Sequence, residues 1–209
     1  MKVLGISGSL RRDSYNTRLL QVASRALPVD ASLEVWSGLA ELPNYNEDVD
    51  VPGGEPAAAG DLRLAIAEAD TVLLVTPEYN GTISGAMKNA IDWASRPRSE
   101  AALKGKPVAV IGAGTGQYGG VWAQADARKA AGIAGARVVG IEFAVANAAQ
   151  AFGEDGGLVD DHALPRLAEL LEALVDEGRK NAAARGRTDA AAHGRTDATA
   201  DGHTDAAAA

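Results

Sequence analysis

The sequence predicts an α/β fold: a doubly wound sheet of five parallel strands with helices on both faces. Three observations lead to this prediction. Apolar runs of strand length alternate along the chain with segments of helical periodicity. The run at residues 71–76 (TVLLVT) is apolar on both faces, which is typical of a strand buried in a parallel sheet. The 209 residues, 46% of them hydrophobic, suffice for one good core.

The first 70 residues contain two predicted strands and two predicted helices. Residues 2–7 (KVLGIS) are a short apolar run, and residues 14–27 place their leucines and alanines on one helical face. Residues 33–36 are expected to form a short second strand, followed by a long loop rich in proline, glycine and aspartate. Helical periodicity returns at residues 57–69.

After the buried strand, the same alternation continues to the last helix. We expect helices at residues 84–95, 121–134 and 164–179, and strands at residues 107–111 and 137–146. Because crossovers between parallel strands are right-handed, few topologies remain for these elements.

A change of composition marks the expected end of the domain. The unit Gly-Arg-Thr-Asp-Ala occurs at residues 186–190 and 194–198, and as Gly-His-Thr-Asp-Ala at residues 202–206. This repeat carries no bulky apolar side chain to offset the entropy of ordering. We therefore predict one domain at residues 1–180 and a low-complexity, disordered tail at residues 181–209, with a helical or partner-binding tail as the alternative.

Composition and charge exclude several classes of function. The absence of cysteine excludes disulfides, thiolate metal sites and thiol nucleophiles. A net charge of −8 argues against a nucleic-acid surface, which needs a basic face. The first residues, MKVLGISGSL, are too short an apolar stretch for a signal sequence, and no run of 18 apolar residues occurs. We expect a cytoplasmic protein that binds no membrane and no metal.

Three loops of unusual composition follow the central strands. They span residues 7–14, 77–85 and 112–120. In a doubly wound sheet, ligands bind outside the carboxyl ends of the strands, where these loops would meet. This convergence is the strongest indication of a site.

The first loop, SGSLRRDSYN, has the composition of a phosphate site. Glycine allows close approach of the backbone, while serine hydroxyls and free amides at a helix start suit a phosphate. Arg11 adds a planar, charged donor. Since no Gly-Lys-Ser/Thr follows, the loop is not a triphosphate-binding loop. In the alternative interpretation, Ser14 only caps a helix and the glycine only turns the chain.

The third loop contains Gly114-Thr115-Gly116-Gln-Tyr-Gly119, a match to G-x-G-x-x-G. A single match is weak evidence for a dinucleotide fold, and this one follows the fourth strand rather than the first. A glycine-rich wall beside a flat ring, or a plain tight turn, are the remaining interpretations.

The second loop begins with Pro-Glu-Tyr-Asn at residues 77–80 and leads into the helix at residues 84–95. Proline ends the ladder of the preceding strand, which leaves an aromatic ring and an amide over the expected site. On the helix, Lys88 and Asp92 are spaced as an i,i+4 ion pair. Its buried face is expected to carry Ala86, Ala90 and Trp93.

The motifs GSLRRDSYN, LPNYNED and PEYNGTISGAMKNAIDW together resemble the NADPH-dependent FMN reductase family, which includes chromate, quinone and azo reductases. The resemblance covers about residues 1–180. It implies a flavodoxin-like fold with strand order 2-1-3-4-5, tightly bound FMN, and NADPH or NADH as the electron donor. It also implies a homodimer or homotetramer, and apolar surface at Met87 and Trp93 supports that expectation.

The resemblance assigns cofactor contacts to all three loops. The residues implied for the FMN phosphate are Ser9, Arg11, Ser14, Tyr15 and Asn16. Those implied for the isoalloxazine ring are Pro77, Glu78, Tyr79, Asn80 and Gly81, with Gly114, Thr115 and Gly116 closing the other side. Tyr45 and Asn46, in the long loop after the second strand, are candidates on the substrate side.

Two residues depart from the family pattern. Family members often carry proline where this chain has Ser84, and arginine where it has Trp122. The second departure puts subunit contacts or contacts on the nicotinamide side in doubt.

The function implied is an NAD(P)H oxidoreductase that passes a hydride through the flavin N5 to a quinone, flavin, azo or chromate-type acceptor by a ping-pong mechanism. Glu78 is expected to position groups rather than to donate a proton. A flavodoxin-like single-electron carrier, against which Arg11 argues, and a flavin-free regulatory protein of the same fold are the alternatives.

Overall fold

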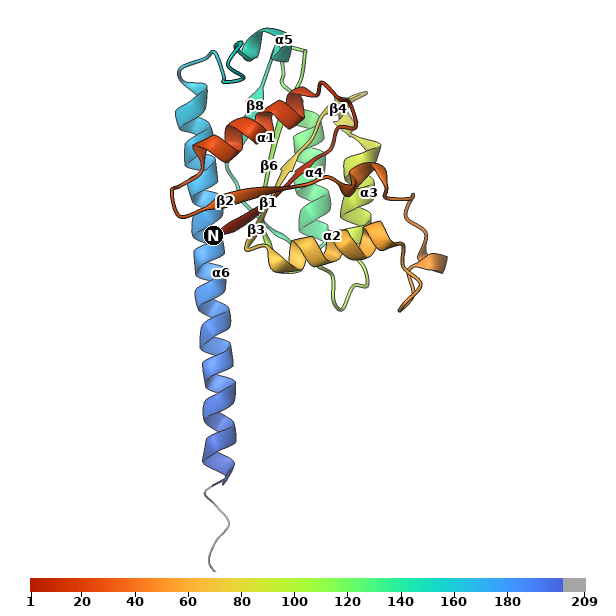
Figure 1. The fold of residues 1–209 in the computed structure, drawn as a ribbon, viewed down its shortest axis with the longest axis vertical. Coiled ribbons are helices and arrows are strands. Elements are labelled where there is room, and N and C mark those ends of the chain that lie inside the picture. Colours follow the sequence, from red (N-terminus) through yellow and green to blue (C-terminus); the bar gives the residue numbers. More distant parts are fainter. Residues whose placement is uncertain (201–209) are drawn as a thin grey trace, which may run out of the picture.

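The structure is a computed structural model that describes residues 1–200, with side chains described through residue 184. A parallel sheet forms its centre, in the order β2-β1-β3-β6-β7, with β8 also paired to β6 (Figure 1). The strands are β1 (Lys2–Ser7), β2 (Ser32–Trp36), β3 (Thr71–Val75), β6 (Pro107–Ala113), β7 (Arg137–Val138) and β8 (Phe143–Val145).

The predicted order 2-1-3-4-5 holds when β7 and β8 are counted as one interrupted edge strand. β7 pairs with the start of β6 (Pro107↔Arg137), and β8 pairs with its end (Ile111↔Phe143). Residues 139–142, predicted to continue the strand, lie in the break. Gly140 is in this break, and glycine weakens a strand because it has no side chain to pack.

The two faces of the sheet are covered by different helices. α1 (Tyr15–Ala26) and α6 (Ala163–Ala200) cover one face, and α2 (Ala57–Glu68), α3 (Gly85–Ala94) and α4 (Val121–Ile133) cover the other (Figure 1). The shorter elements are η1 (Gly38–Ala40), η2 (Glu47–Val49), β4 (Glu78–Tyr79), β5 (Thr82–Ile83) and α5 (Ala148–Ala151).

Alternation along the strands divides the core between the two faces. On β3, Val72 and Leu74 pack toward α2, α3 and α4, while Leu73 and Val75 pack toward α1 and α6. All five β3 residues are buried, as expected for the centre of a parallel sheet. The two-sided apolar run therefore correctly identified the central strand.

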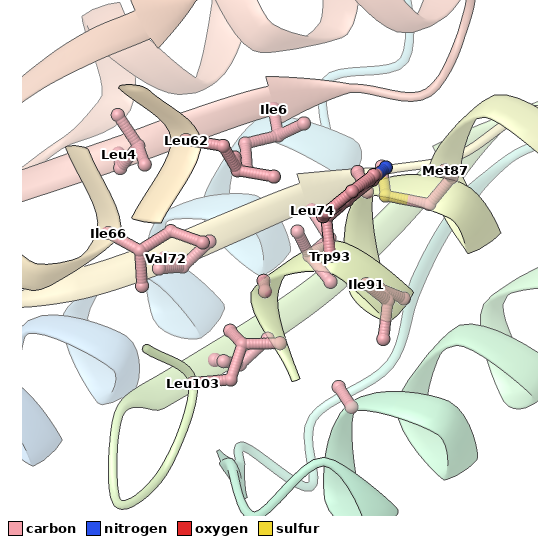
Figure 2. Close-up of a cluster of buried hydrophobic side chains, with 14 of the residues drawn as sticks. Leu4, Ile6, Leu62, Ile66, Val72, Leu74, Met87, Ile91, Trp93 and Leu103 are labelled. Carbon is pink, nitrogen blue, oxygen red and sulfur yellow. The ribbon is translucent and has the colours of Figure 1, made fainter. Parts of the chain in front are cut away.

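α3 carries the most buried aromatic side chain of the face that α2, α3 and α4 cover. Figure 2 shows Trp93 among Leu74, Met87 and Ile91, and Trp93 and Met87 are fully buried. The prediction that Met87 and Trp93 form an apolar surface for subunit contacts is therefore wrong. Both side chains fill the space between α3 and the sheet instead. For Trp93 this agrees with its predicted place on the buried face of the helix. The predicted Lys88–Asp92 pair is present, with Nζ–O distances of 2.5 and 2.7 Å.

The last helix is longer than predicted. α6 continues beyond residue 179 to Ala200 and extends past the rest of the molecule (Figure 1), so the backbone of residues 181–200 is helical where a disordered tail was predicted. Alanine, which is abundant here, has the highest helix propensity, which favours the alternative of a helical tail. Residues 201–209 lie outside the described residues, and the division into domain and tail stays a prediction.

Within residues 1–200, no helix has both the length and the apolar character needed to cross a bilayer. Among residues 1–184, whose side chains are described, no three histidine, aspartate or glutamate side chains are placed to hold a metal ion.

Trp93 provides a test of the core. Its indole nitrogen donates a hydrogen bond of 2.8 Å to the Pro43 carbonyl oxygen. Trp93→Phe removes this bond and part of the buried ring, so we expect a loss of about 1–3 kcal/mol in the free energy of unfolding. Urea denaturation measures it. Trp36→Phe, at a half-buried ring of the edge strand, should cost less, and equal losses for the two variants would contradict this account of Trp93.

Candidate functional site

The three polar loops meet at one edge of the sheet because β1, β3 and β6 are neighbouring parallel strands. Two backbone hydrogen bonds extend the ladder into the loops. The Gly8 amide donates to the Val75 carbonyl at 2.7 Å, and the Thr76 amide donates to the Ile111 carbonyl at 3.0 Å. The loops therefore begin side by side at the carboxyl ends of the strands.

A pocket of about 380 Å³ lies between the first and second loops. Its lining residues are Gly8, Leu10, Arg11, Tyr79, Ser84, Gly85 and Ala86. Of the predicted cofactor residues, Arg11 and Tyr79 therefore line one cavity although they are far apart in the sequence. Arg11 is exposed, and its guanidinium forms no ion pair with the residues that the structure describes. An unpaired cation thus faces this pocket.

Sequence reasoning missed five of the seven lining residues. The position of these residues in the sequence could have indicated them, because Gly8 and Leu10 alternate with the predicted Ser9 and Arg11 in the first loop. Ser84, Gly85 and Ala86 begin α3 at the end of the second loop. A side chain on Gly8 would place its Cβ 2.9 Å from the Met87 Cβ, so glycine is required for the first loop to lie against α3.

Ser84 joins the two loops that form the pocket. Its buried hydroxyl donates to the Gly8 carbonyl oxygen at 2.7 Å and accepts from the Met87 amide at 3.2 Å. The second bond caps the N-terminus of α3. Serine at this position thus supplies a link between the loops that proline could not make.

Asn16 fixes α1 to the end of β6. Its side-chain nitrogen donates to the Ala113 carbonyl at 3.0 Å, and its side-chain oxygen accepts from the Ala113 amide at 2.9 Å. Asn16 is buried, and so is Ser14, whose hydroxyl accepts from the Asn16 and Thr17 amides as the N-cap of α1. These two predicted phosphate residues therefore hold the loop in place.

Ser9 and Tyr15 also make contacts within the protein. The Ser9 hydroxyl accepts from the Arg11 amide at 3.4 Å, which supports the bend that presents the arginine. The Tyr15 ring stacks on Phe152 with centroids 5.9 Å apart. Tyr15 therefore packs against the segment after β8 and is not among the residues that line the pocket.

Glu78 connects the second loop to α4. One carboxylate oxygen accepts from the backbone amides of Trp122 and Ala123, both at 3.1 Å, at the N-terminus of that helix. A carboxylate there is stabilised by two otherwise unpaired amides and by the helix dipole. This arrangement fits a positioning role for Glu78. The neighbouring Thr82 hydroxyl donates to the Asp126 carboxylate at 2.5 Å and holds the same loop to α4.

The second loop is a small hairpin of β4 and β5, which sequence reasoning did not predict. Asn80 and Gly81 form its turn with φ angles of 54° and 73°. Asn-Gly is the preferred pair for a two-residue turn with positive φ at both positions, so this signal was present in the sequence. Pro77, buried at the end of β3, directs the chain into the hairpin.

The third loop is tied to the segment after β8 by its backbone. The Gly114 amide donates to Val145, and the Gly114 and Gly116 carbonyls accept from Ala148 and Asn147, each at 3.0 Å. Thr115 is exposed between them. None of these three predicted residues is among the residues that line the pocket.

Tyr45 and Asn46 do not reach the pocket. The Tyr45 amide donates to the Asn89 side chain at 2.8 Å, and its ring meets Trp93 edge-on at 4.9 Å. Burial, and then the negative charge of Asp50, raises the pKa of the Tyr45 hydroxyl. The Asn46 side chain caps η2. The structure therefore places Tyr45 against α3, while Asn46 stabilises the turn that follows it.

A larger groove of about 560 Å³ lies elsewhere, between α3 and α4. Ile91, Ala130 and Ile133 are among its apolar lining residues. Its charged lining residues are Lys88, Asp92, Arg96, Arg98, Lys104, Asp126 and Lys129. Thr82 and Ile83 of the β4–β5 hairpin also line this groove, whereas Arg11 does not.

Comparison with known proteins identifies the family. Residues 1–150 match the NADPH-dependent FMN reductase family. The chain belongs to this family. An NAD(P)H-dependent FMN reductase of Pseudomonas aeruginosa is 42% identical over 83% of this chain and 93% of its own length. A quinone reductase of Pseudomonas putida is 34% identical over 82% of this chain and 89% of its own length.

A solved structure supports the same assignment. The flavoenzyme NAD(P)H:(acceptor) oxidoreductase of Paracoccus denitrificans superposes with a TM-score of 0.77 at 34% identity, covering 86% of this chain and 98% of the other. The predictions of a flavodoxin-like fold, of an oxidoreductase, and of FMN with NAD(P)H as donor are confirmed.

The pocket of this FMN reductase fits its cofactor. An FMN phosphate carries negative charge, and Arg11 is a cation without an ion-pair partner among the described side chains. The volume of about 380 Å³ lies within the usual range for small-molecule sites, roughly 300–1,000 Å³. Gly8 and Gly85 carry no side chain, so backbone forms part of the lining, and Tyr79 adds an aromatic ring.

The Asn16 contacts yield a prediction that does not depend on the cofactor. Asn16→Ala leaves the amide and the carbonyl of Ala113 without partners, which costs about 1–3 kcal/mol for each buried group. We expect the urea midpoint of the apoprotein to fall accordingly. Gln21→Ala, at an exposed position of α1, is the control and should change it little. An unchanged midpoint for Asn16→Ala would show that the pair contributes nothing to folding.

Proposed function

We propose that this FMN reductase transfers electrons from NAD(P)H to quinones. The observation that carries the proposal is the pocket in which Arg11 of the first loop and Tyr79 of the second loop face one cavity. The family membership supports it, since the related Pseudomonas putida protein is named a quinone reductase. A Burkholderia relative, 41% identical over 61% of this chain and 68% of its own length, is named a 2-hydroxy-1,4-benzoquinone reductase.

In this proposal Arg11 binds the FMN phosphate, and Ser9 supports the bend of the loop. The positive end of the helix dipole at the start of α1 adds to the attraction for an anion. Tyr79 flanks the ring, while Pro77, Asn80 and Gly81 shape the hairpin that carries it. The backbone from Gly114 to Gly116 borders the opposite side.

When bound, FMN supplies the redox chemistry, so that NAD(P)H, a proton and a quinone yield NAD(P)⁺ and a hydroquinone. The protein's own contribution is to bind and orient. Glu78 accepts two backbone hydrogen bonds at the N-terminus of α4, which hold the hairpin to that helix and fit a positioning role. Ser84 fixes the spacing between the loop that carries Arg11 and the helix behind the ring.

Spectroscopy and turnover test the proposal together. The purified protein should show the absorbance bands of bound flavin and should oxidise NAD(P)H when a quinone is supplied. A colourless protein that takes up no FMN would favour a flavin-free regulatory protein. A flavin-bound protein without NAD(P)H oxidation would favour an electron carrier. The cytoplasmic location stays a prediction.

Arg11→Ala tests the phosphate assignment. A charge-assisted hydrogen bond contributes about 1.5–3 kcal/mol, so the dissociation constant for FMN should rise about 10- to 100-fold. Quenching of flavin fluorescence on titration with apoprotein measures it. Arg12→Ala is the matched control, because Arg12 is the exposed neighbour that does not line the pocket. Equal affinities for both variants would refute the role of Arg11.

We further propose a homodimer or homotetramer whose subunits meet at the groove between α3 and α4. The groove has an apolar floor, and its rim carries both signs of charge, for example Asp126 and Lys129 one turn apart on α4. A two-fold axis brings the same patch of both subunits together, so such a rim can pair with itself. Ile133, on this groove, is 76% exposed, an apolar side chain that a second copy would cover.

The mass in solution tests the interface. Light scattering after gel filtration should give a dimer or tetramer for the parent protein. Ile133→Glu places a charge on the apolar floor and should shift the mass toward the monomer. Val29→Glu, at a fully exposed valine that does not line the groove, should leave the mass unchanged. A parent protein that is monomeric would rule the interface out.

A further inference from the structure

The exposed aromatic side chains of this protein gather at one place. The chain has nine aromatic residues (Trp 3, Tyr 4, Phe 2), all within the part whose side chains are described. Among these nine, Tyr79, Tyr118 and Trp122 are exposed, at 49%, 55% and 51%. All three stand on the segments that follow β3 and β6. The other six are buried or half-buried.

The three residues are held in a defined arrangement. The rings of Tyr118 and Trp122 form an edge-on pair with centroids 5.0 Å apart. The Trp122 amide donates to the Glu78 carboxylate at 3.1 Å, and Glu78 is the neighbour of Tyr79. Tyr118 and Trp122 do not line the pocket themselves, but this hydrogen bond places the Trp122 backbone beside the hairpin whose Tyr79 lines it.

Half-exposed aromatic rings favour one class of ligand over another. Stacking a planar ring on an aromatic side chain contributes about 1–3 kcal/mol and removes apolar surface from water. An inorganic oxyanion gains nothing from such a surface, and the net charge of −8 opposes its approach. Arg11 would attract an oxyanion, but in the proposed function the FMN phosphate neutralises it.

We propose that Tyr118 and Trp122 form a stacking platform at the mouth of the site that selects planar, uncharged acceptors, such as quinones, over oxyanions such as chromate. This inference rests on the proposed function and names the acceptor class of that site. Trp122 supplies one of the two rings of this platform, at a position where family members often carry arginine. The platform makes the chain's departure from the family pattern a determinant of specificity.

The platform predicts a change of selectivity in Trp122 variants. In Trp122→Ala, kcat/KM for menadione relative to kcat/KM for chromate should fall about tenfold, the loss of one stacking contact. Trp122→Phe, which keeps a ring, should retain most of the ratio, and Trp122→Arg should lower it furthest. Leu64→Ala, at an exposed apolar residue of α2, is the control and should leave the ratio unchanged.

A binding measurement provides a readout without turnover. Menadione added to the protein in the absence of NAD(P)H should quench part of the tryptophan fluorescence saturably. That part should be missing in Trp122→Phe, because Trp93 is buried and Trp36 is half-buried on the edge strand. This titration tests the platform even if the protein proves not to oxidise NAD(P)H. A failure of the platform can therefore be distinguished from a failure of the proposed function.

Three results would overturn the inference. The selectivity ratio could be the same in Trp122→Ala and the parent. The quenching could persist in Trp122→Phe. The solution mass could fall in Trp122→Ala while the ratio stays constant, in which case the aromatic pair is a contact between subunits.

Discussion

The two hydrogen bonds between the Asn16 side chain and the backbone of Ala113 set the geometry on which the site depends. β3 separates β1 from β6, so no backbone ladder can join the loops that follow those two strands. A side-chain amide carries a donor and an acceptor in one plane, as a peptide group does, and it spans this gap. Because the pair is buried, neither group can exchange its partner for water, and the position of α1 is fixed relative to β6.

From this fixed point, side chains rather than backbone connect the loops to one another. Ser84 joins the first loop to α3, and Glu78 joins the β4–β5 hairpin to α4. Each link ends on backbone groups, so the loops keep their spacing without help from a ligand. A cofactor that needs a cation at one end and flat walls at the other then binds without ordering the loops, which lowers the entropic cost of binding.

Local pattern predicted most of the fold and the general position of the site. Continuous apolar runs identified the central strands, and the loops at their ends met as the parallel topology requires. The tertiary roles of individual residues could not be predicted in this way. The sequence pattern of Met87 and Trp93 is the same whether the helix face packs on the sheet or on a second subunit. Tyr45 lies along α3 because its backbone amide donates to the Asn89 side chain, a contact that no local pattern shows. The Asn80-Gly81 pair is a recognisable signal for a hairpin turn, but the family resemblance assigned both residues to the cofactor, and the turn was not predicted.

The aromatic rim has a consequence for the range of acceptors. Stacking is not directional in the way that hydrogen bonding is, so a platform of Tyr118 and Trp122 distinguishes planar molecules from non-planar ones but discriminates weakly among planar ones. Strong discrimination needs buried polar groups that a wrong ligand leaves unpaired. Ser84 in the pocket and Glu78 beside it are already bonded to backbone groups, Arg11 is assigned to the phosphate, and Tyr79 is exposed rather than buried. The proposed platform therefore implies a family of related quinone acceptors, each bound with modest affinity, rather than a single substrate.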